Sequence, residues 1–157
     1  MTATVDSSLR PLSGWGRTMP TTALVSRPTD APSVLASMCD NTGGIIARGM
    51  GRSYGDAAQC SGGLTIDATG LGHIGVLDEA AETVDVGGGV NLHDLMRHLI
   101  PLGWFVPVTP GTRYVTVGGA IAADVHGKNH HLDGSFCSHV TELTLSTPAK
   151  ASTSFDT

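Results

Sequence analysis

The residues best suited to chemistry form a run of glycines around one arginine and one serine at residues 47–56. Its three glycines are Gly49, Gly51 and Gly55. Glycine takes backbone angles closed to other residues, so main-chain N–H groups in this run can turn toward an anion. Arg52 adds positive charge and Ser53 a hydroxyl. The run predicts a loop that approaches a diphosphate, and a plain structural turn is the alternative.

This run differs from the two common phosphate loops. The chain has no G-x-x-x-x-G-K-S/T motif. The spacing from Gly51 to Gly55 places the last glycine one residue later than in G-x-G-x-x-G. A mononucleotide kinase and a nicotinamide-dependent Rossmann enzyme are therefore disfavoured.

A second glycine-rich region extends from Pro110 to Lys128 and combines small residues with polar ones. Gly118 and Gly119 stand beside small alanines, which leaves room for a flat ring or a diphosphate on the backbone. Close packing of a helix on a strand explains the alanines equally well. Both interpretations stay open from the residues alone.

Three histidines, His126, His130 and His131, lie at and just after the end of this region, and they raise the question of a metal site. His126 and His130 have the His-x-x-x-His spacing that puts two imidazoles on one helical face. Gly127 and Asn129 between them favour a loop, and no Glu occupies the H-E-x-x-H position. We expect polar groups presented to a ligand and no metal site.

The elements that position these segments follow from apolar spacing and turn residues. Strands are expected at residues 23–26, 44–47, 64–67, 104–108 and 140–145, with a strand pair at 75–78 and 82–86. Helices are expected at residues 31–40, at 91–100 and, after a tight turn, within 117–125. Asn91 is a good cap for the second helix, and Pro101 is expected to stop it. The first glycine run follows a strand, where α/β folds commonly place ligand loops.

Composition bounds the class of protein. The 157 residues correspond to about one domain, and the formal net charge of -5 does not indicate a nucleic-acid partner. The three cysteines are far apart and form no C-x-x-C, so neither a disulfide framework nor a thiolate metal site is expected. No run approaches the ~20 apolar residues of a membrane span. The polar start of the chain lacks the apolar core of a secretory signal.

Taken together, the two regions resemble the vanillyl-alcohol-oxidase type of FAD-linked oxidases. The likeness rests on A-R-G-x-G-R-S-Y-G-D, then P-G-T-R, and then V-T-V-G-G-A-I-A-x-D-x-H-G-K-N-H-H, and it runs from residue 14 to residue 145. Within that family the chain is most similar to the members that oxidise decaprenylphosphoryl-ribose. The resemblance implies an α+β (α/β) PCMH-type FAD-binding domain made of two α/β subdomains.

The resemblance also assigns candidate residues. Those implied to bind FAD are Ala47, Arg48, Gly49, Met50, Gly51, Arg52, Ser53, Tyr54, Gly55, Asp56, Gly111, Thr116, Val117, Gly118, Gly119, His126, Gly127, Lys128 and Asn129. His126 and Lys128 are the candidates for substrate positioning and proton handling. Many family members carry at the position of Arg52 a histidine bonded covalently to the flavin. Arg52 cannot form that bond, so dissociable, non-covalent FAD is expected.

The family reaction implies a substrate, a partner and a compartment. It oxidises the 2-hydroxyl of the lipid-linked ribose to a keto sugar, which a partner reductase reduces with inverted configuration for cell-wall arabinan synthesis. The family works at the cell envelope, although a cytoplasmic location fits the absence of an export signal. An alditol or aldonolactone oxidase and a non-catalytic nucleotide-binding remnant are the alternatives.

The resemblance divides the chain into three parts. Residues 1–13 are expected to be a polar leader, 14–147 the N-terminal part of the FAD-binding domain, and 148–157 an unpatterned tail. The family continues into a substrate domain that this sequence does not contain. We therefore expect a truncated form that is incomplete as an enzyme.

Overall fold

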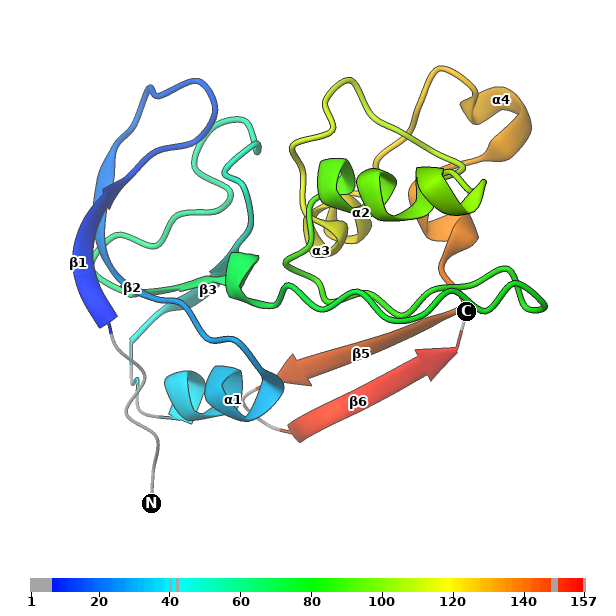
Figure 1. Cartoon of the computed structure of the whole chain (residues 1–157). Helices are drawn as coiled ribbons and strands as arrows, with labels where there is room; N and C mark the ends of the chain where they lie inside the picture. Colours follow the sequence, from blue (N-terminus) through cyan, green and yellow to red (C-terminus); the bar gives the residue numbers. More distant parts are fainter. Residues whose placement is uncertain (1–6, 40, 42, 148–149, 157) are drawn as a thin grey trace.

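The computed structural model describes residues 7–39, 41, 43–147 and 150–156. The first half of the chain forms a sheet with helix α1, and the second half forms a group of helices above a two-stranded sheet (Figure 1). Residues 1–6 of the expected leader and 148, 149 and 157 of the expected tail lie outside the described residues.

The first sheet has the strand order β1-β2-β4-β3. Its strands are β1 (Ser7–Leu12), β2 (Thr21–Ser26), β3 (Ile45–Arg48) and β4 (Leu64–Asp67). Strand β1 runs antiparallel to β2, whereas β2 and β3 run parallel to β4. Helix α1 (Ala31–Cys39) places Val34 against Leu64 and Ile66 of β4, which forms a small core.

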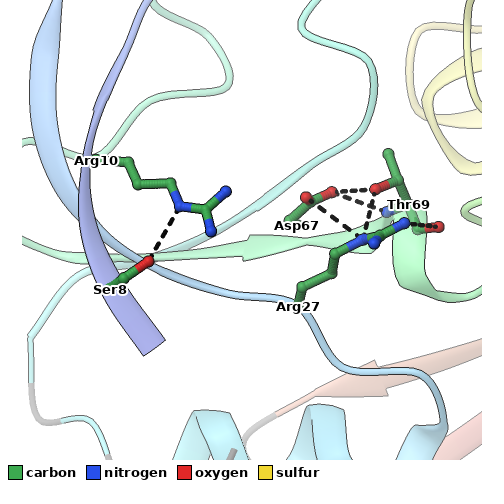
Figure 2. A network of polar contacts seen from close by, with 5 residues as sticks. All are labelled: Ser8, Arg10, Arg27, Asp67 and Thr69. Atoms are coloured by element: carbon green, nitrogen blue, oxygen red, sulfur yellow. Dashed lines mark hydrogen bonds and ion pairs between the residues drawn. The ribbon is translucent and has the colours of Figure 1, made fainter. Parts of the chain in front are cut away.

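The carboxyl ends of β2, β3 and β4 therefore lie along one edge of the sheet. At that edge Arg27 donates from Nε to Thr69 Oγ1 (3.2 Å) and lies 3.8 Å from an oxygen of Asp67, as Figure 2 shows. The Thr69 hydroxyl donates to Asp67 (2.6 Å). These contacts join the segment after β2 to the segment after β4, and the glycine run leaves β3 beside them.

The second half contains helices α2 (Leu92–Leu99), α3 (Val117–Ala122) and α4 (His130–Asp133), and strands β5 (Glu142–Thr147) and β6 (Lys150–Asp156). Leu92, Leu95 and Leu99 of α2 are buried in a larger core with Val117 and Ala120 of α3. The two cores share no buried residue. The expected mixed α/β fold is confirmed.

Most of the expected elements are present close to their expected residues. Strands β2, β3, β4 and β5 and helices α1, α2 and α3 confirm the predictions for their regions. Asp40, the last residue of the first expected helix, lies outside the described residues. Helix α2 ends at Leu99, two residues before Pro101. Pro101 itself lies inside a 3-10 turn, Ile100–Leu102, that continues directly from α2.

The prediction of a strand at residues 104–108 is wrong. This segment has no strand pairing, although Val106 and Val108 are buried in the larger core. Alternating apolar residues there reflect burial of an extended loop, and Pro107 cannot donate a ladder hydrogen bond. The strand pair at 75–86 is reduced to two isolated bridges, Ile74 with Val86 and Asp78 with Thr83.

Two strands lie where the sequence predicted none. Strand β1 falls in the expected leader and is almost entirely exposed, so its residues lack the apolar alternation that marks a half-buried strand. Strand β6 falls in the expected tail and pairs antiparallel with β5. Both strands exist because they pair with a neighbouring strand, β1 with β2 and β6 with β5, and the pattern of a single sequence does not show such pairing. Across the described ranges, no helix is long and apolar enough to cross a membrane.

Candidate cofactor site

The glycine run forms a loop that is held by the side chain of Arg48. Its Nη2 donates to the carbonyl oxygen of Ser13 (2.7 Å), and its Nη1 donates to that of Ala58 (3.1 Å). Burial lowers the pKa of the Arg48 guanidinium from its ordinary value, and the Asp67 carboxylate acts in the opposite direction. The guanidinium of Arg48 thus ties the loop to the segment that follows β1.

The segment after β1 also packs against the tip of this loop. The Trp15 amide donates to the carbonyl oxygen of Ser53 (3.0 Å). A Cβ at Gly14 would overlap the carbonyl oxygen of Gly55, so only glycine permits this approach. Gly55 itself has a positive φ of 64°. Residues 13–15 therefore brace the loop from outside.

Arg52 is the charged side chain at the centre of the loop. Its guanidinium carbon lies 4.6 Å from the centre of the Trp15 ring, and its Nη1 donates to the carbonyl oxygen of Met50 (3.2 Å). Its Nε is buried and has no hydrogen-bond partner within the described part of the chain. A buried donor without an acceptor is costly, which suits a site completed by a bound acceptor.

The two glycine-rich regions meet at one contact. A Cβ at Gly49 would overlap the hydroxyl of Thr116, which is buried. The same hydroxyl accepts from the Gly119 amide (3.1 Å) and so caps helix α3. The loop after β3 and the start of α3 are thus in direct contact, as the diphosphate interpretation requires.

The start of α3 is closely packed against the loop before α2. The Val117 amide donates to the carbonyl oxygen of Val90 (2.8 Å), and the Gly118 amide donates to that of Gly88 (2.9 Å). These amides and that of Gly119 are engaged within the protein. Gly118 also lies so near Gly88 that a Cβ would approach its carbonyl oxygen to 3.0 Å. Close packing, the alternative kept open above, accounts for Gly118, whereas Gly119 is exposed.

The segment from His126 to Asn129 is held against the loop that begins the second region. Asn129 Nδ2 donates to the carbonyl oxygen of Pro107 (3.0 Å), and a Cβ at Gly127 would lie 2.8 Å from that of Thr109. His126 lies outside helix α4, which begins at His130, and their ring centres are 5.2 Å apart. The described residues include no group of three or more His, Cys, Asp or Glu arranged to hold a metal.

Other candidate residues lie at the surface. Tyr54 is 84% exposed, and Asp56, Gly111, His126 and Lys128 are also exposed. Pro110, Gly111 and Thr112 line an open pocket of ≈ 400 Å³ with Leu92, Met96 and Phe105. The structure brings the loop after β3 together with α3, and the segment from His126 together with the loop at Thr109.

The arrangement fits a diphosphate such as that of FAD. Glycines replace side chains where the two regions meet, and Arg52 has a buried Nε–H that finds no acceptor among the described residues. The residues that would hold the group are those of the loop after β3, Gly119 and the segment from His126. Sequence reasoning missed the bracing role of Trp15 and the partner of Gly118. The run G-W-G-R at residues 14–17, an aromatic between glycines, is the signal that could have pointed to Trp15.

Comparisons with known proteins bear on the family and the fold of the chain. Residues 22–152 match the family described as FAD binding domain. The chain is 47% identical over 150 residues to the decaprenylphosphoryl-β-D-ribose oxidase of Mycolicibacterium smegmatis, and the match covers 93% of this chain and 33% of that protein. It is 24% identical over 136 residues to a D-lactate dehydrogenase of Anaerostipes hadrus, of which the match covers 29%.

Among solved structures, a variant of cholesterol oxidase from Brevibacterium sterolicum superposes with a TM-score of 0.82 at 17% identity. That match covers 99% of this chain and 34% of the other chain. Because the identity is only 17%, the match bears on the fold alone. The chain thus spans about a third of the length of these relatives. On the family match and the identity together, the chain belongs to the FAD binding domain family.

Proposed function

We propose that the chain binds FAD without a covalent bond and forms the cofactor site of an oxidoreductase. The loop after β3 would hold the diphosphate, and the segment from His126 would border the flavin ring. Arg52 supports the non-covalent mode, since a guanidinium offers hydrogen bonds and charge but no site for the tether formed by histidine in the wider family.

The substrate proposed is decaprenylphosphoryl-ribose, oxidised at its 2-hydroxyl. The single observation that carries this choice is the 47% identity to decaprenylphosphoryl-β-D-ribose oxidase. When bound, FAD supplies the acceptor for the two electrons and the hydrogen removed from the carbon. His126 and Lys128, both exposed, are proposed to orient the sugar hydroxyl and to accept its proton.

A partner and a location follow from this chemistry. The keto sugar requires a reductase if the configuration at that carbon is to be inverted. A prenyl-linked sugar resides in a membrane, so we propose that the protein works at the cell envelope against the surface that holds its substrate.

The first test is cofactor binding by the 157-residue chain. The purified protein is loaded with FAD, freed of excess cofactor, and precipitated with acid. We expect a flavin spectrum in the loaded protein and release of the colour into the supernatant. Colour that stays in the pellet would contradict non-covalent binding, and a colourless loaded protein would contradict FAD binding by this chain.

The second test is substrate reduction of the bound flavin. The FAD-loaded chain is mixed without oxygen with a prenylphosphoryl-ribose, and bleaching of the visible flavin band is followed. Xylitol, D-lactate and cholesterol serve as competing substrates. Faster bleaching by the ribose lipid supports the proposal, whereas faster bleaching by another of these substrates would overturn the substrate assignment.

A further inference from the structure

Trp15 lies outside both glycine-rich regions, yet it contacts Arg52, whose buried Nε–H finds no acceptor in the described ranges. The indole is 55% exposed, and the Arg52 guanidinium stacks on it at 4.6 Å. A cation over an aromatic face is attracted by the ring quadrupole, most strongly for tryptophan. The ring thus limits the orientations open to Arg52.

The other contacts of the Arg52 side chain do not involve its Nε–H group. Its Nη1 is bonded to the Met50 carbonyl oxygen, whereas its Nε is buried and has no acceptor in the part of the chain that the structure describes. Because a guanidinium is planar and rigid, fixing its face on the indole and one corner on Met50 also fixes where Nε–H points.

The backbone that carries the indole is anchored to the loop independently of Arg52. The Trp15 amide donates to Ser53, and Arg48 donates to the carbonyl oxygen of Ser13 (2.7 Å). The neighbouring Gly14 is packed against Gly55 with no room for a Cβ. The indole therefore extends from a backbone segment that is attached to the loop carrying Arg52.

From these contacts we propose that Trp15 is a positioning residue for FAD, acting through Arg52. It holds the guanidinium in the orientation from which Arg52 contacts the cofactor, and so reduces the ordering that binding requires. The inference rests on the proposed function, because it assumes that FAD is the ligand of this loop.

The test compares FAD dissociation constants of three variants with the wild type. Trp15→Leu keeps an apolar side chain but removes the aromatic face, and we expect about three- to ten-fold weaker binding. Trp15→Phe keeps a face and is expected to restore most of the affinity. Trp104→Phe, which changes a half-buried indole in the second half of the chain, is the matched control and is expected to bind as the wild type does.

A double-mutant cycle separates positioning from general loosening of the fold. If Trp15 acts through Arg52, W15L has less than about a two-fold effect on the dissociation constant in an R52A background. An undiminished effect in that background would overturn the inference. Wild-type protein that binds no FAD would refute the proposed function, whereas wild-type binding with unchanged W15L affinity would refute this inference alone.

A measurement without cofactor checks the geometry itself. The Nε–H proton of Arg52, assigned by its loss in R52A, is expected to carry a ring-current shift in the NMR spectrum. That shift should disappear in W15L and persist in W104F. A resonance that does not move in W15L would show that the indole does not hold the guanidinium.

Discussion

Arg48 and Arg52 lie four residues apart and face different partners. Arg48 donates to two backbone carbonyl groups, that of Ser13 after β1 and that of Ala58 just after the glycine run, so it acts as a structural tie. Arg52 stacks on Trp15 and keeps a buried Nε–H that has no acceptor among the residues that the structure describes. Charge alone does not distinguish the two side chains; their acceptors do.

Asp124 is a second residue whose surroundings set its behaviour. It has a positive φ of 40° and accepts from the Cys137 amide at 3.0 Å. This backbone hydrogen bond, with smaller contributions from the side chains of Ser135 and Cys137 and from His126, lowers the pKa of Asp124 below its ordinary value of 3.8. The carboxylate thus fastens the segment after α3 to the 3-10 turn Phe136–His139.

This pKa predicts how stability depends on pH. A depressed pKa means that the folded protein takes up the proton less readily than the unfolded chain, so the stabilisation is present above pH 3.8 and is lost as pH falls through the folded pKa. Replacing Asp124 by Asn keeps an acceptor and tolerates the positive φ. We expect urea midpoints of D124N to fall less steeply than those of the wild type from about pH 5 to about pH 3. Equal slopes would contradict the prediction.

At the scale of elements, side-chain caps fix the residues at which helices α2 and α3 begin. Helix α2 begins after Asn91, whose Oδ1 accepts from the Asp94 amide (3.0 Å) and whose Nδ2 donates to the Asp94 carboxylate (2.7 Å). Helix α2 carries three buried leucines of the larger core, so the residue at which the helix begins determines whether these leucines face that core. The short helix α3 depends in the same way on the buried hydroxyl of Thr116.

Removal of the α2 cap is expected to destabilise the protein without altering the loop that follows β3. Asn91→Ala leaves the Asp94 amide without its acceptor, which costs about 1 kcal/mol of unfolding free energy. Asn91→Ser retains a capping oxygen and is expected to recover most of that loss. Chemical denaturation of both variants measures the difference, and identical midpoints would rule out the capping role.

At the scale of the whole molecule, one place where the two halves of the chain meet is the contact of Gly49 with Thr116. Gly49 follows β3 of the first sheet, and Thr116 precedes α3 of the second half. The absence of a side chain at Gly49 permits this approach. The candidate site lies at this junction, so its integrity depends on how closely the halves pack.

A methyl group at position 49 is expected to push apart the two segments that meet there, the loop after β3 and the start of α3. Gly49→Ala places a Cβ into the Thr116 side chain, and overpacking of this kind costs about 1–3 kcal/mol. Gly72→Ala is the matched control, since a Cβ there meets nothing within 4 Å. We expect G49A to lower both the denaturation midpoint and the FAD affinity, and G72A to change neither.

The G49A prediction has an internal check. Thr116→Ala removes Oγ1 and Cγ2, the two atoms that the new methyl group would meet most closely, although it also removes the α3 cap. The cost of G49A is therefore expected to be smaller in a T116A background than in the wild type. Additive costs would mean that the two residues do not meet.

The sequence by itself determined what depends on neighbours along the chain. Apolar spacing and the Asn91 cap located α2, a short apolar run located β3, alternation of apolar and polar residues located β4, and glycine spacing located the loop after β3. These signals are local because helix periodicity, capping and turn angles involve residues within a few positions of one another. The FAD family followed from the two glycine-rich motifs together.

Tertiary structure decided the features that depend on partners distant in the chain. Strand β1 exists because β2 pairs with it, and the segment at 104–108 is no strand because it has no such partner. The contact of Gly49 with Thr116 and the stacking of Arg52 on Trp15 join residues that no local pattern connects. Burial and pairing across tens of residues override local propensity, so only the folded chain shows which buried donor of the loop has no acceptor in the described part of the protein.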